Sequence, residues 1–284
     1  MQLSTDTFPA VVRAPDVDLG VVYTYEDDFM PRLLSGLHAS GDGLDLRLIL
    51  VDNDSRRGAG PWLTYFPDTV VLHNRKRLDC FGNRNRILAA SSAPYVLLLD
   101  TDMYFDPAEQ CVAKMVRFME SQPDCGIAGC RLHHEDGQHA PSARRFQTLR
   151  TVLARRLGLE KLMRRTLQRY LYRERAVCDS WPCDWLSGCF QMVRRKAFQE
   201  VGFFDTRFDK YLGDVDVCLR MALAGWWVMY HGATYCYHAE QRSSKNLFSG
   251  DARKHLRSYL RWLVKWGLSP ERALPGQQQP RRAA

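Results

Sequence analysis

The sequence lacks the features of an exported or membrane-spanning chain. None of its apolar runs approaches the roughly 18 residues that a membrane-spanning helix needs. Its start, MQLSTDTFPAVVRAPD, has neither the charged beginning nor the apolar stretch of a signal peptide. These absences lead us to expect a chain that is made and kept in the cytoplasm.

Spaced cysteine pairs are missing as well. The chain has nine cysteines, an odd number, and no two of them are arranged as Cys-x-x-Cys. The tightest group is Cys178, Cys183 and Cys189, whose spacing does not match that of structural zinc sites. We therefore expect reduced thiols, as in a cytoplasmic protein, and no disulfide framework or zinc centre.

The composition is that of a basic globular protein. The chain has 284 residues, 45% of them hydrophobic, which is enough for one large α/β domain or two small ones. Its net charge of +8 suits a partner that carries phosphate, such as a nucleotide, a nucleic acid or an anionic membrane. No repeat is evident. We expect an N-terminal extension (1–16), one large domain (17–250), an amphipathic helix (251–268) and a disordered tail (269–284).

Short apolar runs alternate with helical candidates in the first half of the chain. The expected strands are 19–25, 46–53, 69–73 and 95–100, and the expected helices are 29–40, 80–92 and 107–121. This alternation predicts an α/β fold with a Rossmann-like, mostly parallel sheet covered by helices on both faces. Ligands bind such sheets at the carboxyl ends of the strands, which here carry Thr24, Tyr25, Glu26, Asp52, Asn53, Asp54, Asp100 and Asp102.

Two carboxylates, Asp100 and Asp102, follow the apolar strand YVLLL. Like charges this close raise the cost of ionising each other, and a divalent cation would remove that cost. Mg²⁺ or Mn²⁺ could take oxygen ligands from one or both, with a diphosphate completing the coordination shell. The alternative is a solvated turn, because Asp before Phe-Asp-Pro is ordinary turn chemistry.

The second half of the chain is more basic and less regular. A basic helical stretch covers 152–175, and a turn and strand follow at 183–198. Asp214 opens a helix, where the helix dipole favours a carboxylate that can simply be a cap. Asp216 lies about 200° further round that helix and suits a salt bridge to Arg220, one turn on.

An ordered series of motifs gives the chain a resemblance to a known family. The motifs are VDNDS (51–55), NRNRIL (83–88), LLLDTD (97–102), DWLSGCF (184–190), GFFDTRF (202–208), YLGDVDVCLR (211–220) and YHAEQRSSKN (237–246). In this order they resemble the family 2 glycosyltransferases of the GT-A fold, and among them bacterial rhamnosyltransferase-like members that build surface polysaccharides. Two positions depart from the family pattern: TYED ends the first strand where Asn usually follows the Tyr, and Gly213 replaces a commonly acidic residue.

The resemblance implies a nucleotide-sugar donor, a UDP-, dTDP- or GDP-sugar, held with a divalent metal. It makes Asp102 the direct metal ligand and Asp100 a ribose or water-mediated contact, with His238 beside the metal and diphosphate. It also implies that Asp52 recognises the nucleobase and Arg84 contacts the nucleotide. The expected donor-binding residues are Thr24, Tyr25, Asp52, Asn53, Arg84, Asp100, Arg242 and Lys245.

The family likeness further makes Asp214 the general base that deprotonates the acceptor hydroxyl, in a single displacement with inversion. Trp185, Ser187 and Gly188 would form the acceptor wall, with Asp216 nearby. The acceptor is expected to be a saccharide on a lipid diphosphate. Taken singly, these residue types also suit simpler roles: a strand-to-helix turn at 52–55, a solvated Arg84, a structural His238 and a core Trp185.

Two rival functions start from the same residues. A phosphatase of the haloacid dehalogenase type also begins with a strand and Asp-x-Asp, but it needs Thr or Ser where this chain has Tyr104. A non-catalytic module that binds phosphate, nucleic acid or a membrane surface would explain the charge but not the acidic clusters at the strand ends. We expect no nucleic acid partner. The oligomeric state is not predicted.

The C-terminal helix has an apolar face flanked by basic side chains. Its expected apolar residues are Leu256, Tyr259, Leu260, Leu263 and Trp266, and its basic residues are Arg253, Lys254, Arg257, Arg261 and Lys265. Such a helix can lie in the headgroup region of an anionic membrane or pack its apolar face on the core. With the basic stretch 152–175, it leads us to expect peripheral contact with the inner face of the cytoplasmic membrane.

Overall fold

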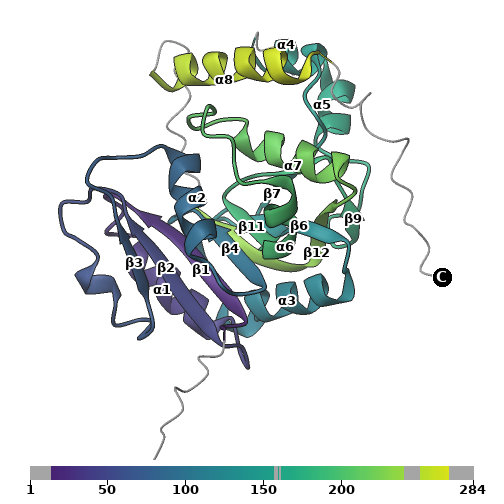
Figure 1. Cartoon of the computed structure of the whole chain (residues 1–284). Coiled ribbons are helices and arrows are strands. Elements are labelled where there is room, and N and C mark those ends of the chain that lie inside the picture. Colours follow the sequence, from purple (N-terminus) through teal and green to yellow (C-terminus); the bar gives the residue numbers. More distant parts are fainter. Residues whose placement is uncertain (1–13, 157–158, 160, 240–249, 269–284) are drawn as a thin grey trace, which may run out of the picture.

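A computed structural model describes residues 14–156, 159, 161–239 and 250–268 of the chain (Figure 1). Its strands are β1 (Val17–Tyr23), β2 (Leu46–Asp52), β3 (Val70–His73), β4 (Tyr95–Leu99), β5 (Met103–Tyr104), β6 (Cys125–His133), β7 (His139–Ala140), β8 (Ala143–Arg144), β9 (Ser180–Pro182), β10 (Trp185–Leu186), β11 (Phe190–Arg194) and β12 (Trp227–His238). Its α-helices are α1 (Met30–Ala39), α2 (Cys80–Ala90), α3 (Cys111–Ser121), α4 (Leu149–Arg156), α5 (Arg164–Tyr170), α6 (Arg195–Val201), α7 (Gly213–Leu223) and α8 (Gly250–Trp266).

One large mixed sheet organises the molecule. Its order is β3-β2-β1-β4-β11-β6-β12-β5, with β7 paired to β6 and β9 paired to β12. The strands β1 to β4, β6 and β12 run in one direction, while β11, β5, β7 and β9 run against their neighbours. The expected α/β sheet is therefore confirmed. The four neighbouring parallel strands, β1 to β4, are the strands that the sequence pattern predicted. A separate two-stranded sheet pairs β10 with β8.

Two hydrophobic cores cover the two faces of the sheet. On one face α1 and α3 pack through residues such as Leu33 and Met115. On the other face α2, α6 and α7 pack through Phe81, Phe198 and Leu219, and α8 joins this second core through Trp262. Both faces of the central strands are thus covered, which explains why β2 and β4 read as continuous apolar runs.

The structure refines two of the expected helices. The segment 107–121 is divided at Gln110, whose left-handed φ of 53° separates the short 3₁₀ turn Pro107–Glu109 from α3. The basic stretch 152–175 contains the end of α4 and all of α5 instead of one helix. Within the described residues, no helix has both the length and the apolar character needed to cross a bilayer. The expected tail 269–284 and nearly all of the extension 1–16 lie outside the described residues.

Candidate active site

The chain brings Asp100, Asp102 and His238 together at one edge of the sheet. Asp100 follows β4, and its backbone N–H donates to the Cys189 carbonyl at 3.0 Å. The two residues of β5 then pair with the end of β12, which aligns Met103 with His238. As a result, His238 Nε2 lies 3.3 Å from Asp102 Oδ1. One ligand atom from each of the three side chains lies within 4.8 Å of the other two.

The chemistry of these three side chains suits a divalent cation. Carboxylate oxygens are the ligands that Mg²⁺ and Mn²⁺ prefer, and an imidazole nitrogen is compatible with Mn²⁺. Burial would lower the pKa of His238, but its hydrogen bonds to Asp102 and Cys189 outweigh burial and raise that pKa to about 11. Without a cation the imidazole therefore carries a proton, which it must release to coordinate metal. The site has the donors and the negative charge that a hard cation needs.

Arg84 on α2 fixes the position of Asp100. Its Nη2 donates to Asp100 Oδ1 at 3.0 Å and to the Gly188 carbonyl at 2.7 Å. The guanidinium is 5% exposed, and its Nη1 is buried without a hydrogen-bond partner among the described residues. A Cβ atom at Gly188 would lie 2.6 Å from Nη1, so a larger residue here would displace the Arg84 guanidinium from this position. A buried, partly unsatisfied guanidinium beside an open pocket is suited to bind an anionic ligand.

Arg84 and Asp100 line a pocket of about 450 Å³ that Asp214 also lines. Asp214 lies in the first turn of α7, where its Oδ1 accepts the Val215 N–H at 3.0 Å. Burial raises the pKa of Asp214 above its ordinary value, although Arg84 acts in the opposite direction. A carboxylate that takes up a proton more readily than usual, at a pocket wall, has the property that a general base needs.

Gly213, which departs from the family pattern, has a steric explanation. A Cβ atom at this position would lie 2.5 Å from the ring of Phe81, which is packed in the second core. The preceding residue, Leu212, holds a left-handed φ of 68°, which the surrounding packing must stabilise. An acidic side chain before Asp214 would therefore require α7 to move away from α2.

The expected donor-binding residues of β1 and β2 lie together at the carboxyl ends of those strands. Asn53 joins them: its Nδ2 lies 3.4 Å from Thr24 Oγ1, and its Oδ1 accepts the Leu78 N–H at 2.9 Å. Tyr25 is 69% exposed beside Arg77. Burial alone would raise the pKa of Asp52, but hydrogen bonds from Ser55 and His73 lower it below the usual value. Asp52 is thus held as a carboxylate at the sheet edge.

The expected acceptor residues divide into two groups. Ser187 and Gly188 line the pocket. Trp185 is 6% exposed, its indole N–H donates to the Arg145 carbonyl at 2.8 Å, and it does not appear among the residues that line this pocket. Asp216 is fully buried and accepts hydrogen bonds from Arg220 and Trp266. Arg242 and Lys245 lie outside the described residues.

Several residues that line the pocket were not anticipated from the sequence. They are Asp79, Cys80, Phe81, Cys189, Asp209, Lys210, Tyr211 and Lys254. Asp209 and Lys210 stand between two recognised motifs and Tyr211 opens the second of them, so their position offered a signal, since a loop between motifs often contacts ligand. Lys254 comes from α8, and nothing in its local sequence indicates that the helix returns to the pocket.

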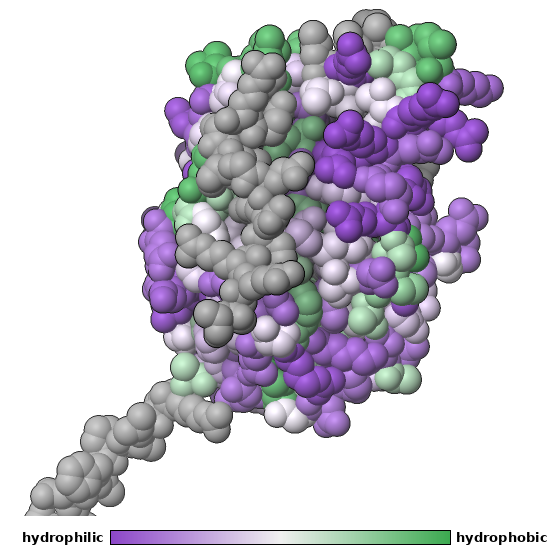
Figure 2. Space-filling model, turned by 90° about the vertical axis from the view of Figure 1, so that its right-hand side faces the viewer, coloured by the Kyte–Doolittle hydropathy of each residue, from purple (hydrophilic) through white to green (hydrophobic). Residues whose placement is uncertain are grey.

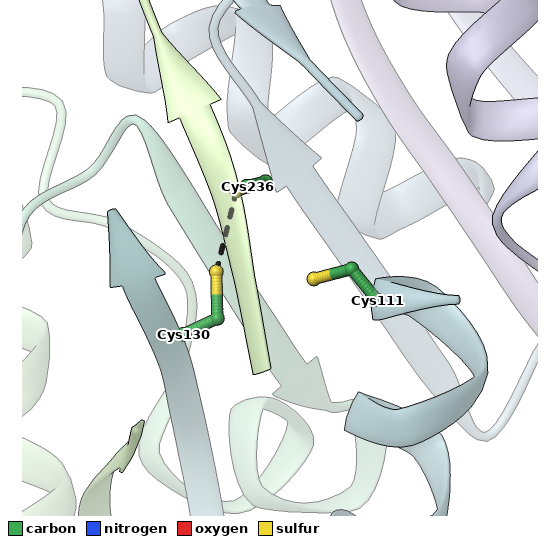
Figure 3. Close-up of side chains that lie close together, drawn as sticks. All are labelled: Cys111, Cys130 and Cys236. Carbon is green, nitrogen blue, oxygen red and sulfur yellow. Dashed lines mark hydrogen bonds between the residues drawn. The ribbon is translucent and has the colours of Figure 1, made fainter. Parts of the chain in front are cut away.

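A second group of potential metal ligands lies away from the pocket. Figure 3 shows the sulfurs of Cys111, Cys130 and Cys236 turned toward one another, with Cys130 Sγ 3.3 Å from Cys236 Sγ. All three side chains are fully buried between α3, β6 and β12. Burial raises the pKa of the Cys130 and Cys236 thiols well above their usual range, whereas hydrogen bonds from these two thiols and from Thr234 outweigh burial and lower the pKa of Cys111. Cys130 and Cys236 act as small apolar residues of the core.

Comparisons with known proteins agree with this geometry. The family model for glycosyl transferase family 2 matches residues 21–202. Rhamnosyltransferase WbbL of Escherichia coli K12 is 27% identical over 249 residues, which cover 84% of this chain and 89% of that protein. N-acetylglucosaminyl-diphospho-decaprenol L-rhamnosyltransferase of Mycobacterium tuberculosis is 30% identical over 169 residues, 58% of this chain and 54% of that protein.

Solved structures share the fold at low identity. The mannosyltransferase PcManGT of Pyrobaculum calidifontis, solved with GDP-Man and Mn²⁺, superposes with a TM-score of 0.62 at 17% identity, covering 94% of this chain and 71% of that one. GalNAc-T7, solved with UDP, GalNAc and Mn²⁺, gives a TM-score of 0.60 at 13% identity, covering 89% of this chain and 49% of that one. These neighbours are GT-A glycosyltransferases, and the fold of this chain is the GT-A fold.

Proposed function

The chain belongs to glycosyltransferase family 2, and we propose that it transfers one sugar, with inversion and with a divalent metal, from a nucleotide-sugar donor to a lipid-linked saccharide. Its relatives support the coarser statement that it is a glycosyltransferase of polysaccharide synthesis. One observation carries the finer proposal. Asp100, from the acidic strand end, and Asp214, from α7, line the same pocket as the buried cation Arg84, which pairs with Asp100.

The donor half of the proposal rests on the acidic strand end. Asp102 and His238 would hold Mg²⁺ or Mn²⁺, and Asp100, fixed by Arg84, would hold the ribose or a water of the ion's shell. A bound cation supplies positive charge that stabilises the departing nucleoside diphosphate. The structural neighbours in complex with Mn²⁺ and GDP-Man or UDP support a nucleotide at this edge of the sheet. Thr24, Asp52 and Asn53 lie at the strand ends where the nucleoside would bind.

The acceptor half rests on Asp214. We assign it the general base, because it lines the pocket and burial raises its pKa. As the acceptor oxygen attacks the anomeric carbon, Asp214 takes the hydroxyl proton, and the bond to the nucleoside diphosphate breaks on the opposite face. One displacement inverts the anomeric configuration and needs no carboxylate nucleophile. Asp100, from the group that would hold the cation, and Asp214, whose pKa burial raises, line one pocket, and this arrangement supports a direct displacement.

The relatives narrow the substrates that we propose. Both are named as rhamnosyltransferases, so a deoxyhexose such as rhamnose is the proposed sugar. The mycobacterial relative is named for an N-acetylglucosaminyl-diphospho-decaprenol acceptor, and a saccharide on a polyprenyl diphosphate is the proposed acceptor here. The basic residues Lys210 and Lys254 at the pocket suit such a diphosphate. The enzyme would then act at the inner face of the cytoplasmic membrane.

A panel of UDP-, GDP- and dTDP-sugars, including a rhamnose donor, tests the proposal. Purified protein should show Mn²⁺- or Mg²⁺-dependent thermal stabilisation by one class of nucleotide and transfer to a polyprenyl-diphosphate N-acetylglucosamine. Asp102→Ala should lose the metal-dependent shift and reduce transfer at least about 10³-fold, because the leaving diphosphate loses its counter-charge. Asp68→Ala, which removes an exposed carboxylate in a turn before β3, is the matched control. Full transfer by Asp102→Ala in EDTA would exclude the metal assignment.

A further inference from the structure

Helix α8 carries two apolar faces, and only one of them is buried. Trp262 is 2% exposed and belongs to the second core, and Tyr259, Leu263 and Trp266 pack against that core. The other face leaves three large apolar side chains in contact with solvent, and a fourth, just beyond the C-terminal end of the helix, is exposed as well. These four residues, the outer stripe, are Leu256 (59% exposed), Leu260 (55%), Val264 (90%) and Leu268 (60%).

From the sequence alone, residues of both faces are expected on a single apolar face. That face contained Leu256 and Leu260 together with Tyr259, Leu263 and Trp266. The structure divides that set: Tyr259, Leu263 and Trp266 pack against the second core, while Leu256 and Leu260 are exposed. Leu256, Leu260 and Val264 follow one another at intervals of four, so they lie along one side of the helix, and Leu268 comes two residues after the helix ends at Trp266. Packing on the core therefore does not account for them.

Ion pairs and a hydrogen bond hold α8 in this orientation. Arg257 and Arg261 both pair with Asp209. Lys265 Nζ lies 2.8 Å from Asp205 Oδ2 and 2.7 Å from Asp216 Oδ1, and the Trp266 indole donates to Asp216 at 2.8 Å. Rotating the helix to bury the outer stripe would break these contacts and expose Trp262. The stripe is thus a fixed feature of the surface.

Other exposed basic and apolar side chains lie on α8 itself and at the start of α5. Arg253 and Lys254 are exposed in the first turns of α8. Leu162, in the turn between α4 and α5, is 82% exposed, and exposed Arg164 and Arg165 follow it. Figure 1 places α4, α5 and α8 at the same end of the molecule, and Figure 2 shows hydrophobic patches among hydrophilic ones at that end. An end of the molecule that exposes apolar side chains together with Lys and Arg complements an anionic bilayer better than a neutral protein surface.

The same helix also reaches the active-site pocket. Lys254 lines that pocket, and the His255 ring lies 4.9 Å from the ring of Tyr211, another lining residue. One side of α8 therefore contributes to the pocket rim while the opposite side exposes the stripe. A surface bound to the stripe would lie beside the pocket, where a diphosphate carried on a membrane lipid would be within reach.

We propose that the outer stripe of α8, with the flanking basic side chains, docks the enzyme on the surface of an anionic lipid bilayer and presents the pocket to a membrane-embedded acceptor. The location of the acceptor rests on the proposed function, while the docking itself does not. The bilayer receives the four apolar side chains at the level of the headgroups, and Arg253 and the arginines of α5 face the anionic phosphates, while Lys254 stays at the pocket.

Vesicle flotation tests the docking directly. The full-length protein should float with vesicles of phosphatidylglycerol and phosphatidylcholine at low salt, and remain at the bottom with phosphatidylcholine alone or at high salt. Val264→Glu should lower the vesicle partition coefficient about tenfold or more, since it places a charge in the apolar contact. Leu63→Glu, which alters an apolar side chain that is 39% exposed in the segment between β2 and β3, is the control and should float like the wild type.

Transfer assays separate docking from the function itself. Val264→Glu should retain wild-type turnover with a water-soluble acceptor analogue and lose about tenfold with acceptor embedded in vesicles. Equal flotation of Val264→Glu and wild type, or no flotation of wild type at low salt, would overturn the docking proposal while leaving transfer to soluble acceptor intact. A wild-type dimer that Val264→Glu converts to a monomer would also overturn it, because the stripe would then be a self-interface. Flotation without transfer from any donor would instead contradict the proposed function alone.

Discussion

The two sides of helix α7 hold carboxylates that differ in almost every physical respect. Asp214 lines the pocket, and its Oδ1 accepts the Val215 N–H at 3.0 Å. Asp216, two positions later, faces α8 and has no exposed surface. Its Oδ2 accepts Arg220 Nε at 2.9 Å, while its Oδ1 accepts the Trp266 indole and lies 2.7 Å from Lys265.

This difference separates a carboxylate suited to chemistry from one suited to structure. Asp216 has both oxygens occupied by fixed donors, two of them cationic, so it has little capacity to accept a substrate proton. Asp214 bears a desolvation cost that raises its pKa, which means that the fold stabilises its charge poorly. A group that is expensive to ionise accepts a proton readily. The comparison therefore favours Asp214 as the base and makes Asp216 the residue that joins α7 to α8.

The largest expected effect is on turnover. Asp214→Asn keeps the shape of the side chain but removes its capacity to accept a proton, so kcat should fall about 10³-fold. Donor binding, followed by the nucleotide-induced thermal shift, should stay within about twofold of wild type. The free energy of unfolding at pH 7 should be unchanged or higher, because the variant no longer buries a costly charge. Near-normal kcat would move the base to another residue.

The second effect is on stability and is confined to the other side of the helix. Asp216→Asn leaves Arg220 and Lys265 without their shared counter-ion, and breaking a buried pair in this way costs about 3 kcal/mol. Urea unfolding should show that loss, while kcat with a soluble acceptor should change far less than in Asp214→Asn. If Asp216→Asn instead lost turnover at unchanged stability, the roles of the two carboxylates would be reversed.

The sequence predicted the first half of the fold well because local pattern decides it. Strands β1, β2 and β4 are buried on both faces, so apolar runs mark them, and the expected bounds of β2, β3 and β4 lie within one residue of the observed ones and those of β1 within two. The short strands β5, β7, β8 and β10, with two residues each, have no periodicity to read. Their positions follow from pairing with distant segments, as β5 does with β12.

The candidate site shows the same division. The carboxylates at strand ends could be named from the sequence, because parallel topology brings strand ends to one edge. The environments of Asp214 and Asp216 could not be predicted in this way. They depend on α8, which packs against α7 although the two contacting residues, Trp266 and Asp216, are fifty positions apart in the sequence. Trp185 likewise became buried through the pairing of β10 with β8. The steric need for Gly213 arises from the Phe81 ring, another long-range contact.

The smallest effect is on the pH dependence of turnover. Since burial raises the pKa of Asp214, the acid limb of kcat/KM should lie above the ordinary Asp value of about 3.9, with activity rising as pH passes through the folded-state pKa. The positive charge of Arg144 favours the ionised form and so lowers that pKa. Arg144→Gln should therefore move the acid limb to higher pH by a fraction of a unit, while Arg117→Gln, an exposed arginine on α3, should not. A shift to lower pH, or equal shifts in both variants, would mean that the limb reports a group other than Asp214, and the electrostatic contrast between the two sides of α7 would lose its kinetic consequence.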